Sequence, residues 1–589
     1  MGIPIQGQDF LLERALLQRK NSELYTGDGS VDIQGKPVLR SKTGKWRASS
    51  FILGTECCER VTYFGIVTNL VSYITSILHK GNVSAARSVS TWNGTCYLTP
   101  LVGAFLADAY WGKYRTIAVF SSIYFIGMCT LTISASIPAF RPPQCLGLTC
   151  PSATPAQSAI FFVGLYLIAV GMGGIKPCIS SFGADQFDDT DPRERVAKGS
   201  FFNWFFFFMY IGALLSSSLI VWIQENVGWA VGFGIPALFM GLAVASFFSG
   251  TRLYRFRLPG GSPVTRISQV VVASLRKWKF VVPQDSSLLY ETSDEHSAIE
   301  GSRKLGHTDG LKRSVTILYL LGYLSDSEMN SCDFSSPWRL CTVTQVEESK
   351  ILIRMFPIWA TSIFFCVVYS QLSTTFVEQA KVMDRTVGSF TIPAASLSVL
   401  YVMSGMVGVL AYDKIVVPMI RNFTGRERGF SELQRIGIGL FISCLAMVAG
   451  ALVESRRLQL AKELDLVDKN VVVPLKFYWQ IPQYFLVGCT DVFSFVGAME
   501  FFYNQSPDAI RSLCVALPLL LTSVGSYLNS LILTIVAAIT TAGGKAGWIP
   551  DNMNQGHLDY FFWLLSGLSF LNLLMYGFCS MKYKPKKVL

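Results

Sequence analysis

Charged side chains are scarce in this chain. Of its 589 residues, only 15% are Asp, Glu, Lys or Arg, whereas soluble domains carry about 25%. Hydrophobic residues make up 51% of the sequence, and the mean hydropathy is +0.40. Apolar stretches near 20 residues recur along most of the chain, and each is long enough to cross a bilayer as a helix. The composition therefore excludes an ordinary soluble protein and predicts an all-α polytopic membrane protein.

Histidine is scarcer still, with only four in the chain: His79, His296, His307 and His557. All four lie near or outside the ends of the apolar stretches. These stretches hold no zinc-ligand spacing and no serine–histidine pairing, so we expect neither an enzyme nor a bound metal or cofactor. Residues 1–48 are polar and contain no cleavable signal peptide, so the first apolar stretch is expected to direct insertion.

Twelve membrane spans are predicted, in two groups of six. They cover residues 50–77, 90–108, 116–138, 159–181, 201–223, 230–250, 351–377, 393–411, 431–453, 475–503, 511–538 and 559–581. The predicted organisation is a tail (1–49), a first half (50–250), a polar linker (251–350), a second half (351–581) and a short tail (582–589).

Basic residues set the predicted orientation of these spans. They gather in both tails and in the turns after spans two, four and eight, which places all of these in the cytosol, together with the linker. The net charge of +11 therefore indicates a membrane lipid boundary and no nucleic acid partner. The turn after span nine is an exception, because it places Arg456 and Arg457 outside.

The outer loops carry two modification signals. Asn82-Val83-Ser84 is an acceptor sequence for glycosylation at Asn82, although an unmodified loop is an equally good interpretation. Cys145 and Cys150 share the next outer loop, where a disulfide can form.

The turn after span two contains Gly103, Asp108, Gly112, Lys113 and Arg115, which resemble the motif of the major facilitator superfamily at this position. The turn after span eight repeats it weakly, with Asp413, Lys414 and Arg421. This resemblance implies two pseudo-symmetric halves with a substrate site near the midplane between them. We expect Asp108, Lys113 and Arg115 to latch cytosolic helix ends, a role compatible with topology signalling.

Ionisable residues inside the spans locate the predicted site. Glu56, Glu59 and Arg60 share one face of the first span, and each costs roughly 2.5–3.5 kcal/mol in a bilayer unless it is paired or hydrated. Span four adds Lys176, and span ten adds Asp491. Two cations in one half that face an acid in the other suit a zwitterion, with its carboxylate at Lys176 and Arg60 and its ammonium at Asp491. The alternative is a static ion pair that locks helix packing.

Glu56-Cys57-Cys58-Glu59-Arg60 matches the E-x-x-E-R motif of the proton-dependent oligopeptide transporter family, which in plants is the nitrate and peptide transporter family. Residues 181–188, 201–206 and 500–507 resemble further signatures of this family. Residues 51–54 and 547–551 are most similar to the plant di- and tripeptide transporters. The resemblance extends over nearly the whole chain.

The resemblance implies a role for each matching position. Glu56, Glu59 and Arg60 would couple proton movement to transport. Lys176 would hold the substrate carboxylate and pair with the motif, and Asp491 would meet the peptide amino terminus. Protonation of a motif carboxylate would loosen its pairing with Arg60 or Lys176.

Several positions depart from the family pattern or bear on the substrate. Asp491 replaces the usual glutamate and is one methylene shorter. Tyr210 and Tyr401 are phenols where smaller polar side chains are usual, so they can narrow the pocket or redirect its hydrogen bonds. Tyr369-Ser370-Gln371 lacks the histidine linked to nitrate binding and the acid of many bacterial members, which argues against nitrate.

The sequence thus predicts a proton-coupled symporter that imports di- and tripeptides by alternating access, with the proton as co-substrate and no cofactor. The alternatives are a proton-coupled carrier of another organic anion or zwitterion, such as a plant hormone or specialised metabolite, or of nitrate, and a receptor that binds without transport. Both the plasma membrane and the vacuolar membrane fit. The apolar run at residues 316–324 has no functional interpretation.

Overall fold

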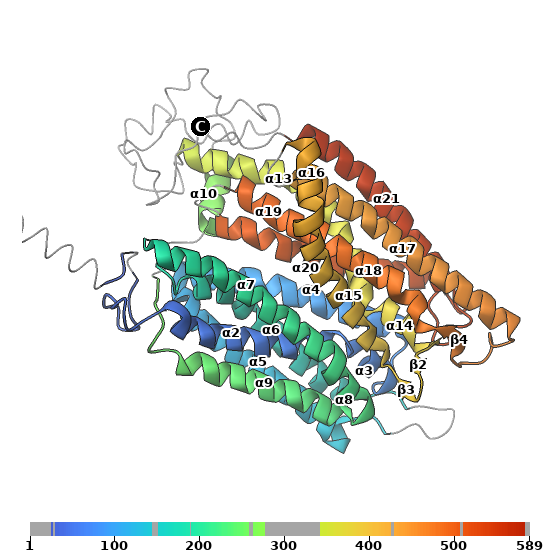
Figure 1. Cartoon of the computed structure of the whole chain (residues 1–589). Helices are drawn as coiled ribbons and strands as arrows, with labels where there is room; N and C mark the ends of the chain where they lie inside the picture. Colours follow the sequence, from blue (N-terminus) through green and yellow to red (C-terminus); the bar gives the residue numbers. More distant parts are fainter. Residues whose placement is uncertain are drawn as a thin grey trace, which may run out of the picture.

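The computed structural model describes residues 25–27, 30–143, 151–188, 190–257, 263–276, 342–425, 429–506 and 511–583. Two helical bundles lie side by side, one coloured blue to green and the other yellow to red (Figure 1). The predicted disulfide between Cys145 and Cys150 and the apolar run 316–324 lie outside the described residues.

The elements follow the predicted order. The first half contains α2 (Lys45–Val67), α3 (Leu70–Ser76), α4 (Asn82–Leu106), α5 (Gly112–Ser136), α6 (Pro155–Ala184), α7 (Pro192–Leu215), α8 (Val221–Asn226) and α9 (Trp229–Ser249). Helix α10 (Pro263–Arg276) lies in the predicted linker. The second half contains α13 (Val343–Ser370), α14 (Thr375–Lys381), α15 (Ser398–Ala411), α16 (Val417–Thr424), α17 (Glu432–Glu463), α18 (Ile481–Thr490), α19 (Val496–Gln505), α20 (Arg511–Thr540) and α21 (Leu558–Lys582). Strand β1 (Met383–Asp384) pairs parallel with β4 (Val473–Lys476), and β2 (Thr386–Val387) pairs antiparallel with β3 (Phe390–Thr391).

The helices account for the twelve predicted spans. Ten segments of the described chain are long and apolar enough to cross a membrane. One of them, Asn82–Ser136, contains two helices, α4 and α5, which change direction at Gly112, a residue with φ of 73°. Helix α2 is not among the ten because Glu56, Glu59 and Arg60 interrupt its apolar sequence. With α2 counted and Asn82–Ser136 divided, the described residues contain the twelve predicted membrane helices, in two groups of six.

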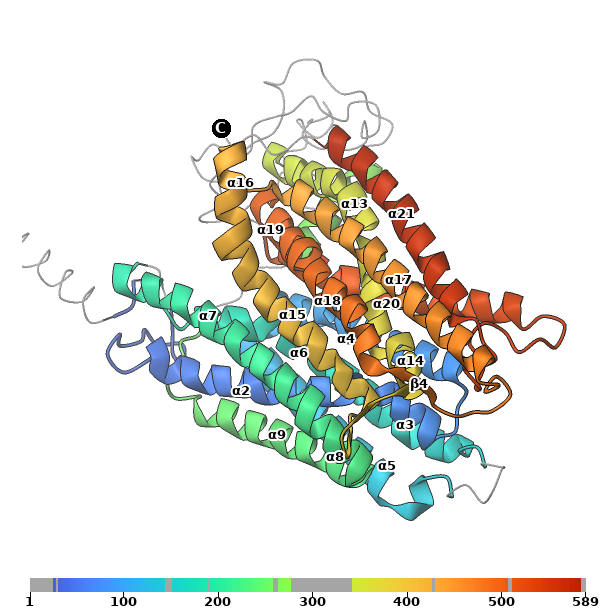
Figure 2. The same cartoon turned by 45° about the vertical axis from the view of Figure 1, so that its right-hand side comes forward.

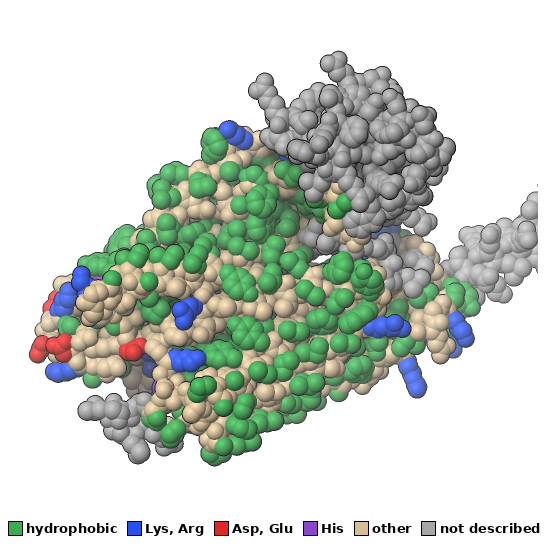
Figure 3. All heavy atoms as spheres, turned by 180° about the vertical axis from the view of Figure 1, so that it is seen from behind, with side chains coloured by type: hydrophobic (Ala, Val, Ile, Leu, Met, Phe, Trp, Pro, Cys, Tyr) green, Lys and Arg blue, Asp and Glu red, His purple; other side chains and the backbone are tan. Residues whose placement is uncertain are grey.

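The outer surface fits a bilayer. Hydrophobic side chains, mixed with backbone and uncharged polar groups, spread over the middle of the face seen in Figure 3. Lys and Arg lie at one end of this face, and acidic and basic side chains gather at the opposite end. The apolar cover is what a lipid-facing surface requires, because the hydrocarbon core offers no partner for a charge.

One of the two arginines that break the charge rule after span nine is neutralised inside the protein. Helix α17 continues ten residues past the predicted end of its span, to Glu463. Arg457 is buried on this extension, where its Nη2 lies 2.6 Å from Glu454 Oε1. It also donates to the Met553 carbonyl at 2.9 Å and to Asn554. Since Arg457 is neutralised inside the protein, it does not act as an orientation signal.

The two halves repeat one local feature. Both α4 and α15 continue into a widened π-helical turn, Ala107–Trp111 and Tyr412–Val416 respectively. Asp108 and Asp413 are the second residues of these turns, so the weak sequence repeat corresponds to a repeated backbone conformation. This supports the predicted pseudo-symmetry of the halves.

Gly103 carries the tightest packing between α4 and α6. A Cβ atom there would lie 2.5 Å from the Gly173 carbonyl carbon and even closer to its oxygen. We therefore expect Gly103→Ala to force the helices apart at a cost of about 1–3 kcal/mol or more, measured as a lower melting temperature of the detergent-solubilised protein. Gly567→Ala in α21 is the matched control, since no atom lies within 4 Å of the added carbon. Equal melting temperatures of the two variants would contradict this packing.

Candidate functional site

Arg60 holds two carboxylates on the first membrane helix. Its Nε lies 2.9 Å from Glu56 Oε1, and its Nη2 lies 2.6 Å from Glu59 Oε2. All three side chains are buried. The spacing of three and four residues along α2 brings them onto one face, as the sequence predicts. Because two acids share one cation, one of them can take up a proton while Arg60 stays paired with the other. No buried charge is then left unpaired.

Lys176 stands apart from this group. Its Nζ lies 3.3 Å from the centroid of the Tyr97 ring and 4.3 Å from that of Tyr63. Within the described part of the chain it has no hydrogen-bond partner and no ion pair. The pairing of Lys176 with the motif, which the family resemblance implies, is therefore absent from this conformation, because Arg60 already engages both carboxylates. Lys176 is half-buried, and its Nζ is covered by the two aromatic rings.

Asp491 lies in a widened turn of span ten. Helices α18 and α19 are joined by the π-helical turn Asp491–Phe495. The Tyr401 hydroxyl donates to Asp491 Oδ2 at 3.0 Å, and the Tyr401 ring packs edge-on against Tyr369 with centroids 5.7 Å apart. The unusual phenol at position 401 therefore orients the shorter acid.

A cavity of about 130 Å³ lies between the halves. Its lining includes five predicted site residues, which are Arg60, Tyr210, Tyr369, Tyr401 and Asp491. Glu56, Glu59 and Lys176 do not line it: the two acids lie behind Arg60, and Lys176 lies behind Tyr97. Apolar side chains complete the wall, namely Phe64, Met209, Ala213, Val402, Phe365 and Phe495.

Tyr63 and Tyr97 are the functional residues that the sequence reasoning missed. Tyr97 lines the cavity and covers Lys176. Tyr63 covers Lys176 from another side and donates to Asn93 Oδ1 at 2.7 Å. Tyr63 lies three residues after Arg60, on the same helix face, and this spacing was the available signal. Tyr97 carries no such signal in the sequence.

Hydrogen bonds between the halves close one end of their interface. They join Thr75 to Lys381, Asn82 to Asp551, Ser90 to Asn529, Thr91 to Ser530, Asn93 to Ser526, Gly94 to Ser523 and Thr95 to Tyr527. The N-half partners all belong to residues 75–95, the end of the molecule predicted to face outward. Here α3 contacts α14 and α4 packs on α20, while α16 and α7 diverge at the other end (Figure 2). The structure is thus closed at the end that the basic residues predict to lie outside the cytosol.

Asn82 is part of this closure. Its backbone N–H donates to Asp551 Oδ1 at 3.1 Å, and its Nδ2 donates to the Pro550 carbonyl at 3.0 Å. The side chain is buried. This arrangement argues against the glycosylation predicted at Asn82, because the nitrogen that would carry the sugar is buried and hydrogen-bonded to the Pro550 carbonyl.

Asp551 is expected to stabilise the closed outer end, because its carboxylate lies at the positive amino terminus of α4. Asp551→Ala should therefore shift molecules toward an outward-open form. The measurement is labelling of Ser373→Cys by a membrane-impermeant thiol reagent added from outside, corrected for the signal without this cysteine. Ser373 lines a small cavity on the outer side of Tyr369 and Tyr401.

Asp468→Ala is the control for this labelling. Among the described residues, Asp468 accepts a hydrogen bond only from Gln555, which belongs to the same half. We expect labelling to rise several-fold with Asp551→Ala and to stay unchanged with Asp468→Ala. Equal rates in both variants would show that Asp551 does not hold the outer end closed.

The three predicted latch residues differ in their surroundings. Lys113 Nζ lies 2.6 Å from Asp185 Oδ2 at the end of α6, and Arg257 Nε lies 3.6 Å from the other oxygen of this carboxylate. Arg115 is exposed and Asp108 is half-buried. Lys113 thus joins α5 to the chain after α6 within the first half, and a gating role for all three stays a prediction.

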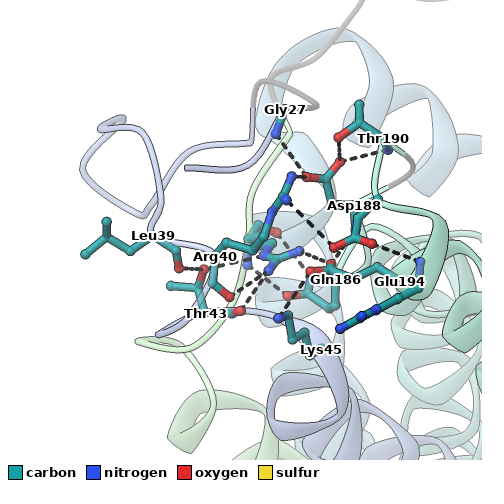
Figure 4. A network of polar contacts seen from close by, with 12 residues as sticks. Gly27, Leu39, Arg40, Thr43, Lys45, Gln186, Asp188, Thr190 and Glu194 are labelled. Carbon is teal, nitrogen blue, oxygen red and sulfur yellow. Dashed lines mark hydrogen bonds and ion pairs between the residues drawn. The ribbon is translucent and has the colours of Figure 1, made fainter. Parts of the chain in front are cut away.

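A larger polar network surrounds Asp188 and Glu194, which follow Asp185 closely in the sequence (Figure 4). Asp188 accepts from Arg40 at 2.7 Å, and Arg255 Nη1 lies 2.7 Å from Glu194 Oε2. Burial alone would raise the pKa of Asp188, but hydrogen bonds from Thr190, Gly27 and Arg40 outweigh it and lower the pKa. Asp188 therefore keeps its negative charge at neutral pH. Its contacts with Gly27 and Arg40 fasten the amino-terminal segment to the turn between α6 and α7.

The fold and the cavity define a class of protein. Two six-helix bundles with a charged cavity at their interface form the fold of the major facilitator superfamily. Solved structures support this fold. An auto-inhibited POT family peptide transporter gives a TM-score of 0.68 at 22% identity, covering 92% of this chain and 98% of that one. A peptide transporter POT in complex with alafosfalin gives 0.60 at 17% identity, covering 91% and 94%.

The family follows from sequence comparison. The model of the POT family, PTR2, matches residues 114–549. NRT1/PTR FAMILY 8.3 of Arabidopsis thaliana is 61% identical over 577 residues, which cover 98% of each chain. NRT1/PTR FAMILY 8.1 of the same plant is 52% identical, covering 96% of this chain and 99% of that one. The chain belongs to the POT family, and it is a multi-pass membrane transporter, not an enzyme.

Proposed function

We propose that this transporter imports di- and tripeptides together with protons by alternating access. The observation that carries the proposal is the pair of opposite charges in one cavity: Arg60 from the first half and Asp491 from the second. A peptide with free termini carries a carboxylate and an ammonium at its two ends, so it can bridge the halves. Charged hydrogen bonds of this kind contribute about 1.5–3 kcal/mol each.

Lys176 supports the same assignment. Because it has no ion-pair partner among the described residues, its charge is available to the substrate carboxylate, with Tyr97 between it and the cavity. Rotation of the Tyr97 ring would open the way to Nζ. The apolar walls formed by Phe64, Phe365 and Phe495 can contact peptide side chains of many kinds, so the cavity would not select one peptide sequence.

Proton coupling is assigned to Glu56 and Glu59. When one of them takes a proton, Arg60 loses a partner and gains capacity for the substrate carboxylate. Substrate and proton then favour the same loaded state, in which the halves can rock. Release to the cytosol restores the group of Arg60 and its two acids, and the empty carrier returns.

A carrier of another organic anion or zwitterion is the second candidate. It rests on Tyr401 and Tyr210, because Tyr401 already occupies one oxygen of Asp491 and both phenols narrow the cavity. A substrate with a hydroxyl or ring in place of the ammonium would suit this arrangement.

The test is inward current in voltage-clamped oocytes, in acidic and neutral medium, with dipeptides, nitrate and an abscisic-acid-type anion. Peptide symport predicts a dipeptide current that grows in acid. No dipeptide current from protein shown to be at the surface would reject the peptide assignment, and a current with the organic anion would favour the second candidate. Saturable binding without current would indicate a receptor.

A further inference from the structure

A buried arginine outside the cavity lies against the widened turn that contains Asp491. Arg435 belongs to α17, is buried, and plays no part in the proposed transport chemistry. Its Nη2 donates to the Val492 carbonyl at 2.8 Å, and its Nη1 lies 3.2 Å from Glu500 Oε2 on α19. One side chain thus joins α17, the widened turn and α19.

The widened turn needs such support. A π-helical turn adds one residue to the helix and is less stable than regular helix, and such turns frequently occur at functional sites. Here the extra residue sets the face on which Asp491 lies relative to α19. If the turn returned to regular helix, residues on one side of it would rotate by about 100°, the angle per residue of an α-helix. Asp491 would then leave the cavity wall.

Packing around Arg435 is specific to this turn. The guanidinium lies 4.2 Å from the centroid of the Tyr412 ring, which packs edge-on against Phe493 within the turn. One residue further along α17, the Ile436 carbonyl accepts from Ser494 at 3.4 Å. A Cβ on Gly439 would lie 2.5 Å from the Ser494 nitrogen, so α17 touches the turn along its length. Within the described part of the chain, these partners offset the cost of burying the guanidinium.

We propose that Arg435, held by Glu500, is a positioning residue for Asp491, which it keeps on the cavity wall by fixing the widened turn of span ten. The effect of Arg435 on uptake rests on the proposed function, in which Asp491 binds the substrate ammonium. The effect of Arg435 on the position of Asp491 does not depend on the substrate.

The first measurement follows position 491 directly. Asp491→Cys is labelled by a small thiol reagent in the otherwise unchanged protein and together with Arg435→Gln, with the signal from the native cysteines subtracted. We expect Arg435→Gln to lower the labelling rate about fivefold or more, and Arg456→Gln, an exposed arginine of the same helix, to leave it unchanged. An unchanged rate in Arg435→Gln protein that reaches the membrane in normal amount would overturn the proposal. If that variant fails to fold, Glu500→Gln serves as the second variant, with the same expected decrease and the same overturning result.

The second measurement is a double-substitution cycle on uptake. Arg435→Gln and Asp491→Asn should each raise the KM of a dipeptide with a free amino group, by about tenfold, with little change for the N-acetylated dipeptide. The combined variant should be no worse than Asp491→Asn alone. Additive losses, or a lower maximal rate with unchanged KM, would assign Arg435 to folding only. If Asp491→Asn itself has no effect on KM, then Asp491 does not bind the substrate ammonium, and that part of the proposed function is rejected. The labelling rate of Asp491→Cys still decides whether Arg435 positions residue 491.

Discussion

Glu59→Gln is expected to abolish the acid-stimulated dipeptide current. Glu59 is fully buried, and its Oε2 lies 2.6 Å from Arg60 Nη2. Glutamine keeps the size and one hydrogen-bonding oxygen, but it cannot exchange a proton, so uptake can no longer draw on the proton gradient. Exchange of labelled for unlabelled peptide requires no net proton movement and should survive. The measurement is current against external pH, together with exchange in vesicles.

Glu463→Gln is the control for this prediction, because Glu463 is a half-exposed glutamate at the outer end of α17. It should give a wild-type current. A wild-type current from Glu59→Gln at equal surface amount would remove Glu59 from the coupling mechanism and leave Glu56 as the remaining acid of the motif.

Lys176→Met is expected to raise the KM for a dipeptide with a free carboxylate by about 10–100-fold, since a charge-assisted hydrogen bond contributes about 1.5–3 kcal/mol. Methionine is similar in length and can keep the packing against Tyr63 and Tyr97 while removing the charge. A dipeptide amidated at its carboxyl end should be transported equally by both proteins. The concentration dependence of labelled uptake at acidic pH measures both effects.

The chain offers a matched control for Lys176→Met. Lys80 Nζ also lies over an aromatic ring, 4.5 Å from the centroid of Phe162, but outside the cavity. Lys80→Met should leave the KM unchanged. An equal loss for the free and the amidated dipeptide in Lys176→Met would show that this lysine supports the fold and does not bind the carboxylate.

Several features of the site were predictable because ionisable residues are conspicuous in apolar sequence. Glu56, Glu59 and Arg60 interrupt the first span, and helical periodicity alone places them together. Lys176 and Asp491 stand out in their spans for the same reason. Tyr210, Tyr369 and Tyr401 were found only by comparison with the family pattern, and the cavity includes all three.

Other features depend on contacts that no local pattern encodes. Lys176 was expected to pair with the motif, but the position of α6 relative to α2 places it against Tyr97 and Tyr63 instead. Asn82 reads as a loop acceptor in the sequence, yet the loop before α21, more than 460 residues later, covers it.

The sequence by itself determined the class of this protein: a membrane protein with twelve spans in two halves and with charges inside the first, fourth and tenth spans. It could do so because the bilayer imposes length, polarity and charge rules on each segment separately. The orientation that the basic residues indicate stays a prediction. The tertiary structure alone decided which side chains share the cavity, which end of the interface is closed, and that span ten widens at Asp491 against Arg435. These depend on how helices distant in sequence pack together, because the contacts of a side chain are defined only once the surrounding helices have packed.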